Sequence, residues 1–500
     1  MAASEPEVQQ RTYGNWRRPN TAGLGNLGLA PTLMVIGGLV LVVLATLISV
    51  AAAALMAVLV LLLVAPLAIK DRYGRTLLVR LTGAWAGRRA RSSGTALYRS
   101  GPLGRTAHGA AQLPGLAARS TLSEAADSYG RPFGLISYPT GHHVVVLACE
   151  ADGASLVEQS QVDTWVAYWG RWLGDLGTEP GLVGCSVTVE TAPDTGLRLR
   201  REIEAHTADD APQLAKQMLA EVLEDYPAGS AQITTRIALT YSSAPRPGHP
   251  RRTVEEMAVD LGLRLPGLTE SLSMTGAGVA VPLSAERIAE AARVAYDPAV
   301  APLVEEVRGR DESTGITWET AGPLSAEDRR DHYIHDSAVS VTWCMAEAPR
   351  GEVLSSVLTG LLAPHPDVAR KRVTLLYRPH DPATAARQVE ADRKIALFRV
   401  QQGPRARARH DLELRAAEQS ATEEAAGAGL VRFSLLVTAT VADVEDLPRA
   451  RAAVDNLAGP ARIVLRPVWD SQAAAFAAAL PIGLVLPDHL ALPASIRDNL

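Results

Sequence analysis

The sequence predicts an α+β protein in which a two-helix transmembrane hairpin precedes two cytoplasmic α+β domains with ferredoxin-like connections. Three observations support this fold class: a long uncharged apolar run near the N-terminus, repeated strand-helix-strand patterns after it, and a break rich in proline and arginine between two sets of these patterns. We therefore expect five segments, at residues 1–30, 31–70, 71–110, 111–242 and 254–490.

The apolar run is long enough for two membrane spans. No charged residue occurs in the 37 residues from Leu33 to Ile69, whereas roughly 20 apolar residues cross a bilayer. A division near Ser49 to Ala54 gives two short spans joined by a tight turn. A secretory signal peptide has a much shorter apolar core, so we do not interpret this run as a cleaved signal. We favour this hairpin over the alternative, a single long tilted helix that would translocate the C-terminal region.

Cationic residues flank this run on both sides. They are Arg11, Arg17, Arg18, Lys70, Arg72, Arg75, Arg80, Arg88, Arg89 and Arg91. Because positive residues stay on the cytoplasmic side, we expect a multi-pass protein of the cell membrane with both termini in the cytoplasm. Residues 1–30 form a cytoplasmic arm, in which Tyr13 and Trp16 suit the headgroup level. Residues 71–110 form a basic juxtamembrane linker, either attracted to anionic lipid or simply solvated.

The first soluble domain, residues 111–242, alternates strands and helices. Its expected strands are 134–138, 144–149, 183–191 and 232–241, and its expected helices are 157–176 and 209–226. Trp165, Trp169 and Trp172 recur at helical spacing, which predicts a core-facing helix side. The segment from Ser242 to Arg252 lacks apolar periodicity and predicts a domain boundary.

The second soluble domain, residues 254–490, repeats this alternation. Ser284 is expected to cap the helix 285–296, although Arg287 stands where a capping box would have Glu or Gln. The other expected helices are 254–263, 352–362, 444–457 and a long charged helix 382–426 that could break at Gly403 and Pro404. The expected strands are 279–282, 338–346, 373–377, 430–441 and 462–465.

Sequence motifs give no argument for an enzyme. The four lysines precede Asp71, Gln217, Arg372 and Ile395, so no phosphate-binding P-loop is present. Gly23, Gly25 and Gly28 match a dinucleotide-binding pattern but lie between a polar arm and an apolar helix, where that pattern cannot function. The formal net charge of −5 gives no broad basic field, and we expect no direct nucleic-acid binding.

Histidine spacing offers only a weak metal hypothesis. His332 and His335, beside Asp336, could share one helix face and begin a metal site, but the alternative that they are ordinary polar residues at a strand is favoured. His142 and His143 fall on opposite faces of a strand. We predict no catalytic, cofactor or metal residues, no cofactor and no enzymatic activity.

The long charged helix carries a series of arginines among acidic residues. These are Arg387, Arg393, Arg399, Arg405, Arg407, Arg409 and Arg415. A solvated, salt-bridged helix face is the first interpretation. A docking surface for a partner is the second.

Two stretches resemble parts of type IV secretion and conjugation systems. The N-terminal hairpin and its exit, "APLAIKDRYGRTLLVRL" and "LYRSGPLGR", resemble the two-helix inner-membrane subunit. The C-terminal half, from "DHYIHDSAVSVTWCMAEAPRGEVLSSVLTGLL" through "VRFSLLVTATVADVEDLPRA" to "FAAALPIG", is similar to the N-terminal, non-catalytic domain of the secretion ATPase. That domain closes with a phenylalanine and a Leu-Pro pair, which are Phe476, Leu480 and Pro481 here. Arginine greatly outnumbers lysine, which is typical of a high-GC genome such as that of an actinobacterium.

The resemblance implies a membrane anchor and docking domain without the motor, because only about twenty residues follow the Leu-Pro pair. The expected function is a non-enzymatic scaffold in an actinobacterial secretion or conjugation-like system. Its expected partners are membrane lipids, a separate P-loop secretion ATPase, polytopic membrane subunits and further copies of itself. Two alternatives remain: the E-type membrane component of type VII secretion (EccE), and a membrane-tethered enzyme with an unrecognised site.

Overall fold

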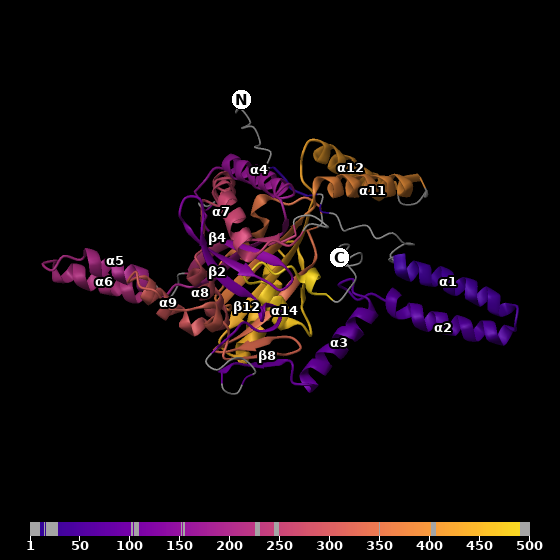
Figure 1. Cartoon of the computed structure of the whole chain (residues 1–500), viewed down its shortest axis with the longest axis horizontal. Helices are drawn as coiled ribbons and strands as arrows, with labels where there is room; N and C mark the ends of the chain where they lie inside the picture. The colour runs from indigo at the N-terminus through magenta and orange to yellow at the C-terminus, as the bar shows by residue number, and fades with distance from the viewer. Residues whose placement is uncertain are drawn as a thin grey trace, which may run out of the picture.

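The computed structural model describes residues 11–14, 16, 29–101, 104, 110–151, 153, 156–225, 231–244, 250–349, 351–401 and 407–490. This part of the chain combines helices with one large sheet, and one of its helices is long and apolar enough to cross a membrane. A mixed helix-and-sheet fold is therefore confirmed. Figure 1 shows a central body from which helical pairs project at both ends of the long axis.

Over the described residues the sheet has thirteen strands, and every neighbouring pair is antiparallel. The strand order is β1-β8-β9-β10-β12-β11-β5-β6-β4-β3-β2, with β13 beside β10 and β7 beside β4. The strands are β1 Leu97–Arg99, β2 Thr121–Ala126, β3 Pro132–Ser137, β4 His142–Glu150, β5 Leu182–Pro193, β6 Ala231–Ser242, β7 Val279–Pro282, β8 Ser325–Asp328, β9 Tyr333–His335, β10 Ala338–Glu347, β11 Arg370–Pro379, β12 Val431–Val441 and β13 Val464–Pro467.

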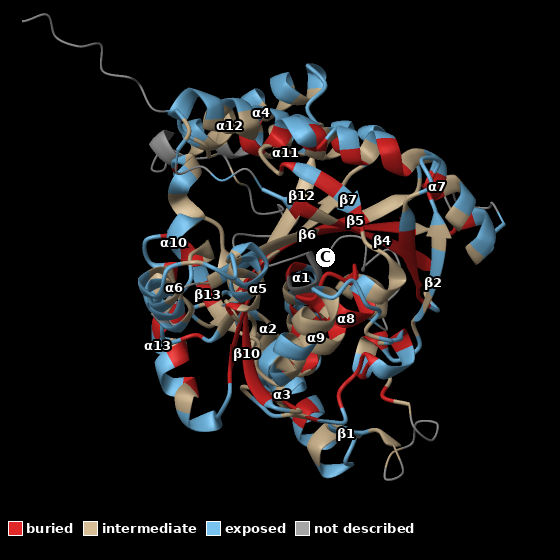
Figure 2. Cartoon of the chain, turned by 90° about the vertical axis from the view of Figure 1, so that its left-hand side faces the viewer, coloured by how far each residue is buried: buried red, intermediate tan, exposed pale blue. Residues whose placement is uncertain are grey.

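The helices lie on both faces of this sheet and beyond its ends. They are α1 Leu29–Thr46, α2 Val50–Ala68, α3 Leu77–Ser92, α4 Gln159–Asp175, α5 Leu197–His206, α6 Gln213–Asp225, α7 Val254–Glu270, α8 Ala285–Tyr296, α9 Ala301–Arg308, α10 Thr359–Leu362, α11 Pro382–Gln401, α12 Arg407–Ala425, α13 Leu447–Ala458 and α14 Gln472–Ala478. Figure 2 shows that buried residues gather in the strands, whereas the outer helix faces are exposed.

The sheet contains the same arrangement twice. In the first repeat the chain runs β4-α4-β5-α5-α6-β6-α7-β7, and the strands lie in the order β7-β4-β6-β5. In the second repeat it runs β10-α10-β11-α11-α12-β12-α13-β13, and the strands lie in the order β13-β10-β12-β11. Both repeats thus carry a helical pair between their second and third strands.

Pairing of β5 with β11 joins the two repeats into one sheet. Thr188 lies opposite Thr374 in the middle of this pairing, and their hydroxyl oxygens are 3.2 Å apart. Each strand would otherwise be an exposed edge with unpaired backbone groups. The sheet continues across the predicted division between residues 111–242 and 254–490. The division into two domains stays a prediction.

One face of the sheet is covered by helices of both repeats. Val145 and Leu147 of β4 pack toward α4 and α7 with Trp172, whereas Val341 and Val437 pack toward α10 and α13. Residues alternate between faces along a strand, so Val144 and Val146 point to the opposite face, where they contact α8 and α14. The predicted core role of Trp172 is confirmed, since only 4% of it is exposed.

The C-terminal segment, which runs from Gln472 at the start of α14 to Gly483, crosses that opposite face and contacts both repeats. Phe476 and Leu480 are fully buried. The hydroxyl of Thr374 in β11 donates to the carbonyl of Ala479, and the hydroxyl of Thr240 in β6 donates to the carbonyl of Gly483, both at 2.8 Å. The segment therefore fastens the second repeat to the first.

A buried ion cluster lies beside the same seam. Glu190 of β5 accepts hydrogen bonds from Arg372 at 2.9 Å and Arg370 at 3.1 Å, and Arg236 of β6 lies 3.5 Å away. Burial alone would raise the pKa of Glu190, but the three guanidinium groups outweigh it and hold that pKa well below its ordinary range. The ionised carboxylate is thus the shared counter-charge of both repeats.

Several predicted elements differ from the structure. Residues 71–110, predicted as a linker, contain helix α3 and strand β1. The predicted long helix 382–426 is two antiparallel helices, α11 and α12, while Gly403 and Pro404 lie outside the described residues. The charged helix α5 was not predicted, and the predicted helix 352–362 is helical only from Ser355. Ser284 does cap α8, because its hydroxyl accepts from the amide of Arg287.

We predict that Gly483→Ala destabilises the protein by about 2–4 kcal/mol, as the sum of left-handed backbone strain and overpacking. Gly483 has a φ of +66°, and a Cβ atom there would lie 2.5 Å from both Thr240 Oγ1 and Val144 Cγ1. Thermal unfolding of the detergent-solubilised full chain measures the effect.

Gly315→Ala is the matched control for this prediction. Gly315 has a φ of +65°, but an added Cβ there meets no atom within 4 Å. The control should lose only the backbone contribution of about 1–2 kcal/mol. Equal losses in the two variants would contradict tight packing of the C-terminal segment against the sheet.

Candidate membrane interface

Helices α1 and α2 form a pair that projects from the body (Figure 1). The turn between them falls at residues 47–49, where the hydroxyl of Ser49 accepts from the amide of Ala52 and caps α2. The pair approaches closely at Gly38, since a Cβ atom there would lie 2.4 Å from Val60 Cγ1. Small residues permit this close contact between apolar helices.

The surface of this pair is apolar and exposed. Large side chains that face outward include Leu33, Ile36, Leu39, Val43, Leu47, Ile48, Val50, Leu55, Val58, Leu61, Leu62 and Leu63. At the turn, Leu47 and Ile48 are each 82% exposed. Contiguous apolar surface of this kind marks a contact with lipid or with another protein.

Length and composition distinguish the two helices. Among the described residues, α2 alone is long and apolar enough to span a membrane, with a mean hydropathy of 2.8 over its span. The apolar part of α1, Thr32–Thr46, is shorter. The structure thus contains one candidate spanning helix and a shorter apolar neighbour.

The polypeptide leaves α2 through a short basic turn. Asp71 organises this turn, because its Oδ1 accepts from the amides of Tyr73 and Arg75, each at 2.9 Å. Its other oxygen, Oδ2, accepts from Arg75 Nε at 3.2 Å. Thr76 then caps α3 by accepting from the amide of Val79. This ordered turn therefore connects the apolar helix pair directly to helix α3.

Helix α3 is basic and amphipathic. Leu78, Leu81 and Trp85 are exposed at helical spacing, and Arg88 and Arg89 follow them. The guanidinium of Arg89 lies 5.8 Å from the ring centre of Trp85. An exposed stripe of Leu and Trp beside arginine is typical of a helix at a membrane surface. The lipid-attracted interpretation of residues 71–110 stays a prediction for this helix.

The basic turn and α3 are held on the body by the two residues Trp469 and Asp470, which precede α14. Arg91 donates to Asp470 Oδ1 at 2.9 Å, and a Cβ atom on Gly87 would lie 2.5 Å from that same oxygen. The guanidinium of Arg75 lies 4.8 Å from the ring centre of Trp469, within the range of a cation–π contact. Neither residue was singled out from the sequence, and only the three-dimensional contact reveals them.

Asp328 lies next to this junction. Its Oδ1 accepts from the amide of Ala473 in the first turn of α14 at 3.2 Å. Burial raises the pKa of Asp328 to about 6, and the nearby charge of Asp470 adds to the shift, against the opposing amides and Arg91. The junction therefore contains a carboxyl group that changes charge close to neutral pH.

The histidines considered as metal ligands have other partners. His335 is fully buried, with Nδ1 2.6 Å from the carbonyl oxygen of Tyr296 and Nε2 2.8 Å from Ser340 Oγ. Burial lowers its pKa to about 4. His332 Nδ1 lies 2.9 Å from Asp331. Both nitrogens of His335 have hydrogen-bond partners, so neither is available to bind a metal with His332, as the disfavoured metal hypothesis would require.

The adjacent residues His142 and His143 also have different partners. His143 Nδ1 lies 2.9 Å from Ser137 Oγ, whereas His142 Nε2 lies 3.4 Å from Asp488. Within the described residues, no group of three or more His, Cys, Asp or Glu side chains is arranged to hold a metal ion.

Part of the N-terminal arm lies on the body. Tyr13 pairs through its backbone with Val353 at 2.8 Å in both directions, and its hydroxyl donates to Asp163 of α4 at 3.1 Å. An open hollow of about 570 Å³ lies beside it, lined by Arg11, Asp163, Tyr168 and Arg171 among others. Tyr13 therefore contacts the body, and its predicted headgroup position stays a prediction. Arg17, Arg18, Gly23, Gly25 and Gly28 lie outside the described residues.

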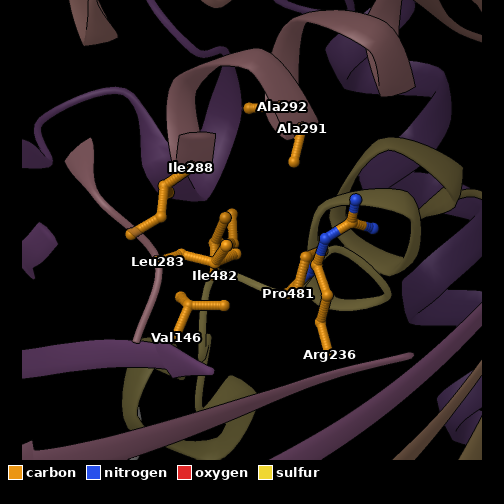
Figure 3. Close-up of a pocket in the computed structure, with 8 residues that line it drawn as sticks. All are labelled: Val146, Arg236, Leu283, Ile288, Ala291, Ala292, Pro481 and Ile482. Carbon is orange, nitrogen blue, oxygen red and sulfur yellow. The ribbon is translucent and has the colours of Figure 1, made fainter. Parts of the chain in front are cut away.

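A narrow crevice between β4, α8 and the C-terminal segment is shown in Figure 3. Apolar side chains such as Val146, Ile288 and Ile482 line it, and Arg236 is the charged residue among those labelled. The crevice is too narrow to admit a water molecule. It is a packing seam of the body and offers no space for a substrate.

These features define a protein with a helix-and-sheet body joined through a basic helix to exposed apolar helices. Over residues 20–78 the chain is similar to the family described as a domain of unknown function (DUF8461). That range contains α1, α2 and the start of α3. The comparison with curated proteins found no match. The matched range therefore covers the apolar helix pair and its basic exit.

We predict that Asp328→Asn stabilises the chain at neutral pH. The folded-state pKa of about 6 exceeds the ordinary value of about 4, so the folded state binds the proton more tightly and the native chain loses stability as pH rises through this window. Two pKa units correspond to roughly 3 kcal/mol. The unfolding temperature of the variant should exceed that of the native chain at neutral pH, and the difference should vanish near about pH 4.

Glu224→Gln is the control, because Glu224 lies on the exposed side of α6. It should change the unfolding temperature little at any of these pH values. An Asp328→Asn chain with the same pH dependence as the native chain would contradict a raised pKa at the junction.

Proposed function

We propose that this chain is a non-enzymatic membrane scaffold of a type IV secretion or conjugation-like system. In this proposal α1 and α2 insert as a hairpin into the cell membrane, with both ends in the cytoplasm. The body then docks a separate P-loop ATPase, contacts polytopic membrane subunits and self-associates.

The exposed apolar surface of α1 and α2 carries the proposal. Side chains such as Leu39, Val43 and Leu61 would otherwise face water, at about 25 cal/mol for each Å² of apolar surface. The basic residues Lys70, Arg72 and Arg75 follow the pair directly, as expected on the cytoplasmic side. Membrane insertion satisfies both observations together.

We further propose that each repeat is a ferredoxin-like module. Counted along the chain, each repeat has the order strand, helix, strand, strand, helix, strand once its helical pair is set aside. The fourth and first strands are neighbours in both, as are the third and second. Two such modules fit a rigid docking platform.

The docking role rests on the resemblance of residues 330–490 to the non-catalytic domain of secretion ATPases. Phe476, Leu480 and Pro481, the residues that carry the resemblance at its end, lie in the segment that joins the two repeats. A non-catalytic domain that is joined to its motor in one protein can dock a separate motor in another protein. The chemistry of force generation would then belong to the partner.

Deletion of residues 29–68 is expected to release the protein from membranes. Cells that produce the full chain and the deleted chain are fractionated, and the membranes are washed with alkaline carbonate to remove peripheral proteins. The full chain should stay in the pellet and the deleted chain should move to the soluble fraction. A chain lacking residues 197–225, the α5–α6 pair, should stay in the pellet, and carbonate-resistant membrane association of the 29–68 deletion would contradict the anchor.

Affinity purification of the detergent-solubilised full chain from its native host tests the docking role. Mass spectrometry should recover a P-loop ATPase together with polytopic membrane subunits. Recovery of type VII secretion components would instead favour the EccE alternative. A well-folded sample without any partner above background would contradict the scaffold.

A further inference from the structure

Helix α3 begins where the candidate spanning helix α2 ends. The amide of Leu77, the first residue of α3, donates to the carbonyl of Ile69 at 2.9 Å. Within the turn, the amide of Asp71 donates to the carbonyl of Arg75, also at 2.9 Å. Figure 1 shows that α3 then turns away from the axis of α1 and α2. Insertion of α2 under the proposed function would therefore place the start of α3 at the bilayer surface.

The two faces of α3 have different surroundings. Gly87 and Arg91, one turn apart, face the body, where both lie close to one carboxylate oxygen. Leu78, Leu81 and Trp85 are spaced by three and four residues, and their side chains are exposed. At 3.6 residues per turn, this apolar stripe lies roughly 120° around the helix from the attached face. The body therefore holds one face of α3 and leaves the stripe uncovered.

The charge around the stripe is positive. Residues 72–123 contain nine arginines and no Asp or Glu. Arg88 and Arg89 are exposed, and neither has an acidic partner in the part of the chain that the structure describes. A polybasic segment that directly follows a spanning helix on its cytoplasmic side attracts anionic lipid. An anionic lipid surface fits this stripe better than a second copy of α3, because two copies would bring like charges together.

We propose that α3 is an interfacial helix that lies in the headgroup layer of an anionic membrane. The proposal rests on the insertion of α1 and α2 under the proposed function, which brings α3 to the bilayer. Leu78, Leu81 and Trp85 enter the boundary between headgroups and acyl chains, while Arg88 and Arg89 contact lipid phosphates. The indole suits this depth, because its apolar ring and its N–H group need different surroundings.

This contact fixes the orientation of the body. Helix α3 lies between the bilayer and the body, since its face at Gly87 and Arg91 is attached to Asp470. The body is thus held by a helix at the membrane surface as well as by the span. A span alone would let the body rotate around the axis of the hairpin.

An environment-sensitive dye at position 85 tests this contact in the full chain. Trp85→Cys is labelled, so that the dye replaces the indole, and is reconstituted into vesicles of phosphatidylcholine alone or mixed with phosphatidylglycerol. In the mixed vesicles the dye emission should shift to the blue, and shielding from an aqueous quencher should be at least about twofold greater. Cys149 and Cys185 are buried, and the parent chain labelled in parallel gives the background from Cys344.

Leu263→Cys on α7 is the matched control, because its native side chain is 68% exposed, against 64% for Trp85. Figure 1 places α7 on the part of the body away from α1 and α2. The dye at 263 should remain in water in both kinds of vesicle. Replacing Arg88 and Arg89 by Gln in the Trp85→Cys chain should lower the shielding in mixed vesicles to its value in phosphatidylcholine. Thermal unfolding verifies that each variant folds as the parent does.

The remaining outcomes separate the two proposals. A chain that fails to float with either vesicle overturns both membrane insertion and this contact. A chain that floats while the dye at 85 stays in water in both vesicles overturns the contact of α3 alone. Equal shielding in the two kinds of vesicle overturns the binding of anionic headgroups. Shielding that disappears when each vesicle contains a single chain reveals a contact between copies and likewise overturns the proposal.

Discussion

The pairing of β5 with β11 is the interaction on which the rest of the structure depends. Both strands would be free edges if the repeats were separate, and their register brings Glu190 opposite Arg372 and Thr188 opposite Thr374. Removing one member of a buried ion pair costs about 3–5 kcal/mol, so Glu190 makes the two repeats interdependent. Antiparallel pairing of equivalent strands also relates the repeats by an approximate two-fold rotation. Helical pairs inserted at the same point of each repeat must then project in opposite directions.

The local parts of the fold were predictable because they are encoded in short patterns. Strand β7 and helix α8 match their predicted bounds, residues 279–282 and 285–296, since a proline, a capping serine and clear periodicity mark them. Helix α5 has a charged sequence with few apolar residues, and α14 is a short run of alanines, so neither gives a periodic signal. The pairing of β5 with β11 joins residues about 180 positions apart, which no local pattern can specify.

The same distinction holds for the candidate membrane interface. The apolar run and its basic flanks are visible in sequence, whereas a single serine within an apolar run, Ser49, is too weak a signal to identify the cap of α2. Its attachment to the body depends on Trp469 and Asp470, nearly 400 residues later in the chain. Asp470 also adopts a φ of +62°, which is uncommon for a non-glycine residue. Such contacts arise only from the complete fold.

A continuous series of contacts leads from the apolar helices to the seam between the repeats. Arg91 on α3 binds Asp470, and α14 begins two residues later with Gln472, which is fully buried. The amide of Gln472 bonds the backbone of Thr342 in β10 through its oxygen at 2.8 Å and its nitrogen at 3.2 Å. Thr342 lies between the stretches of β10 that pair with β9 and with β13.

From there α14 and the segment after it reach Thr374 and Thr240, one in each repeat. A load applied to α2 and α3 would therefore arrive where β5 and β11 meet, and not at a sheet edge. In the proposed scaffold, which would hold a motor against a membrane, antiparallel strands fastened on both sides of the seam would share this load. The buried charge of Glu190 then has a structural role, since separation of the repeats would leave the guanidinium groups of Arg370 and Arg372 in the second repeat without their partner in the first.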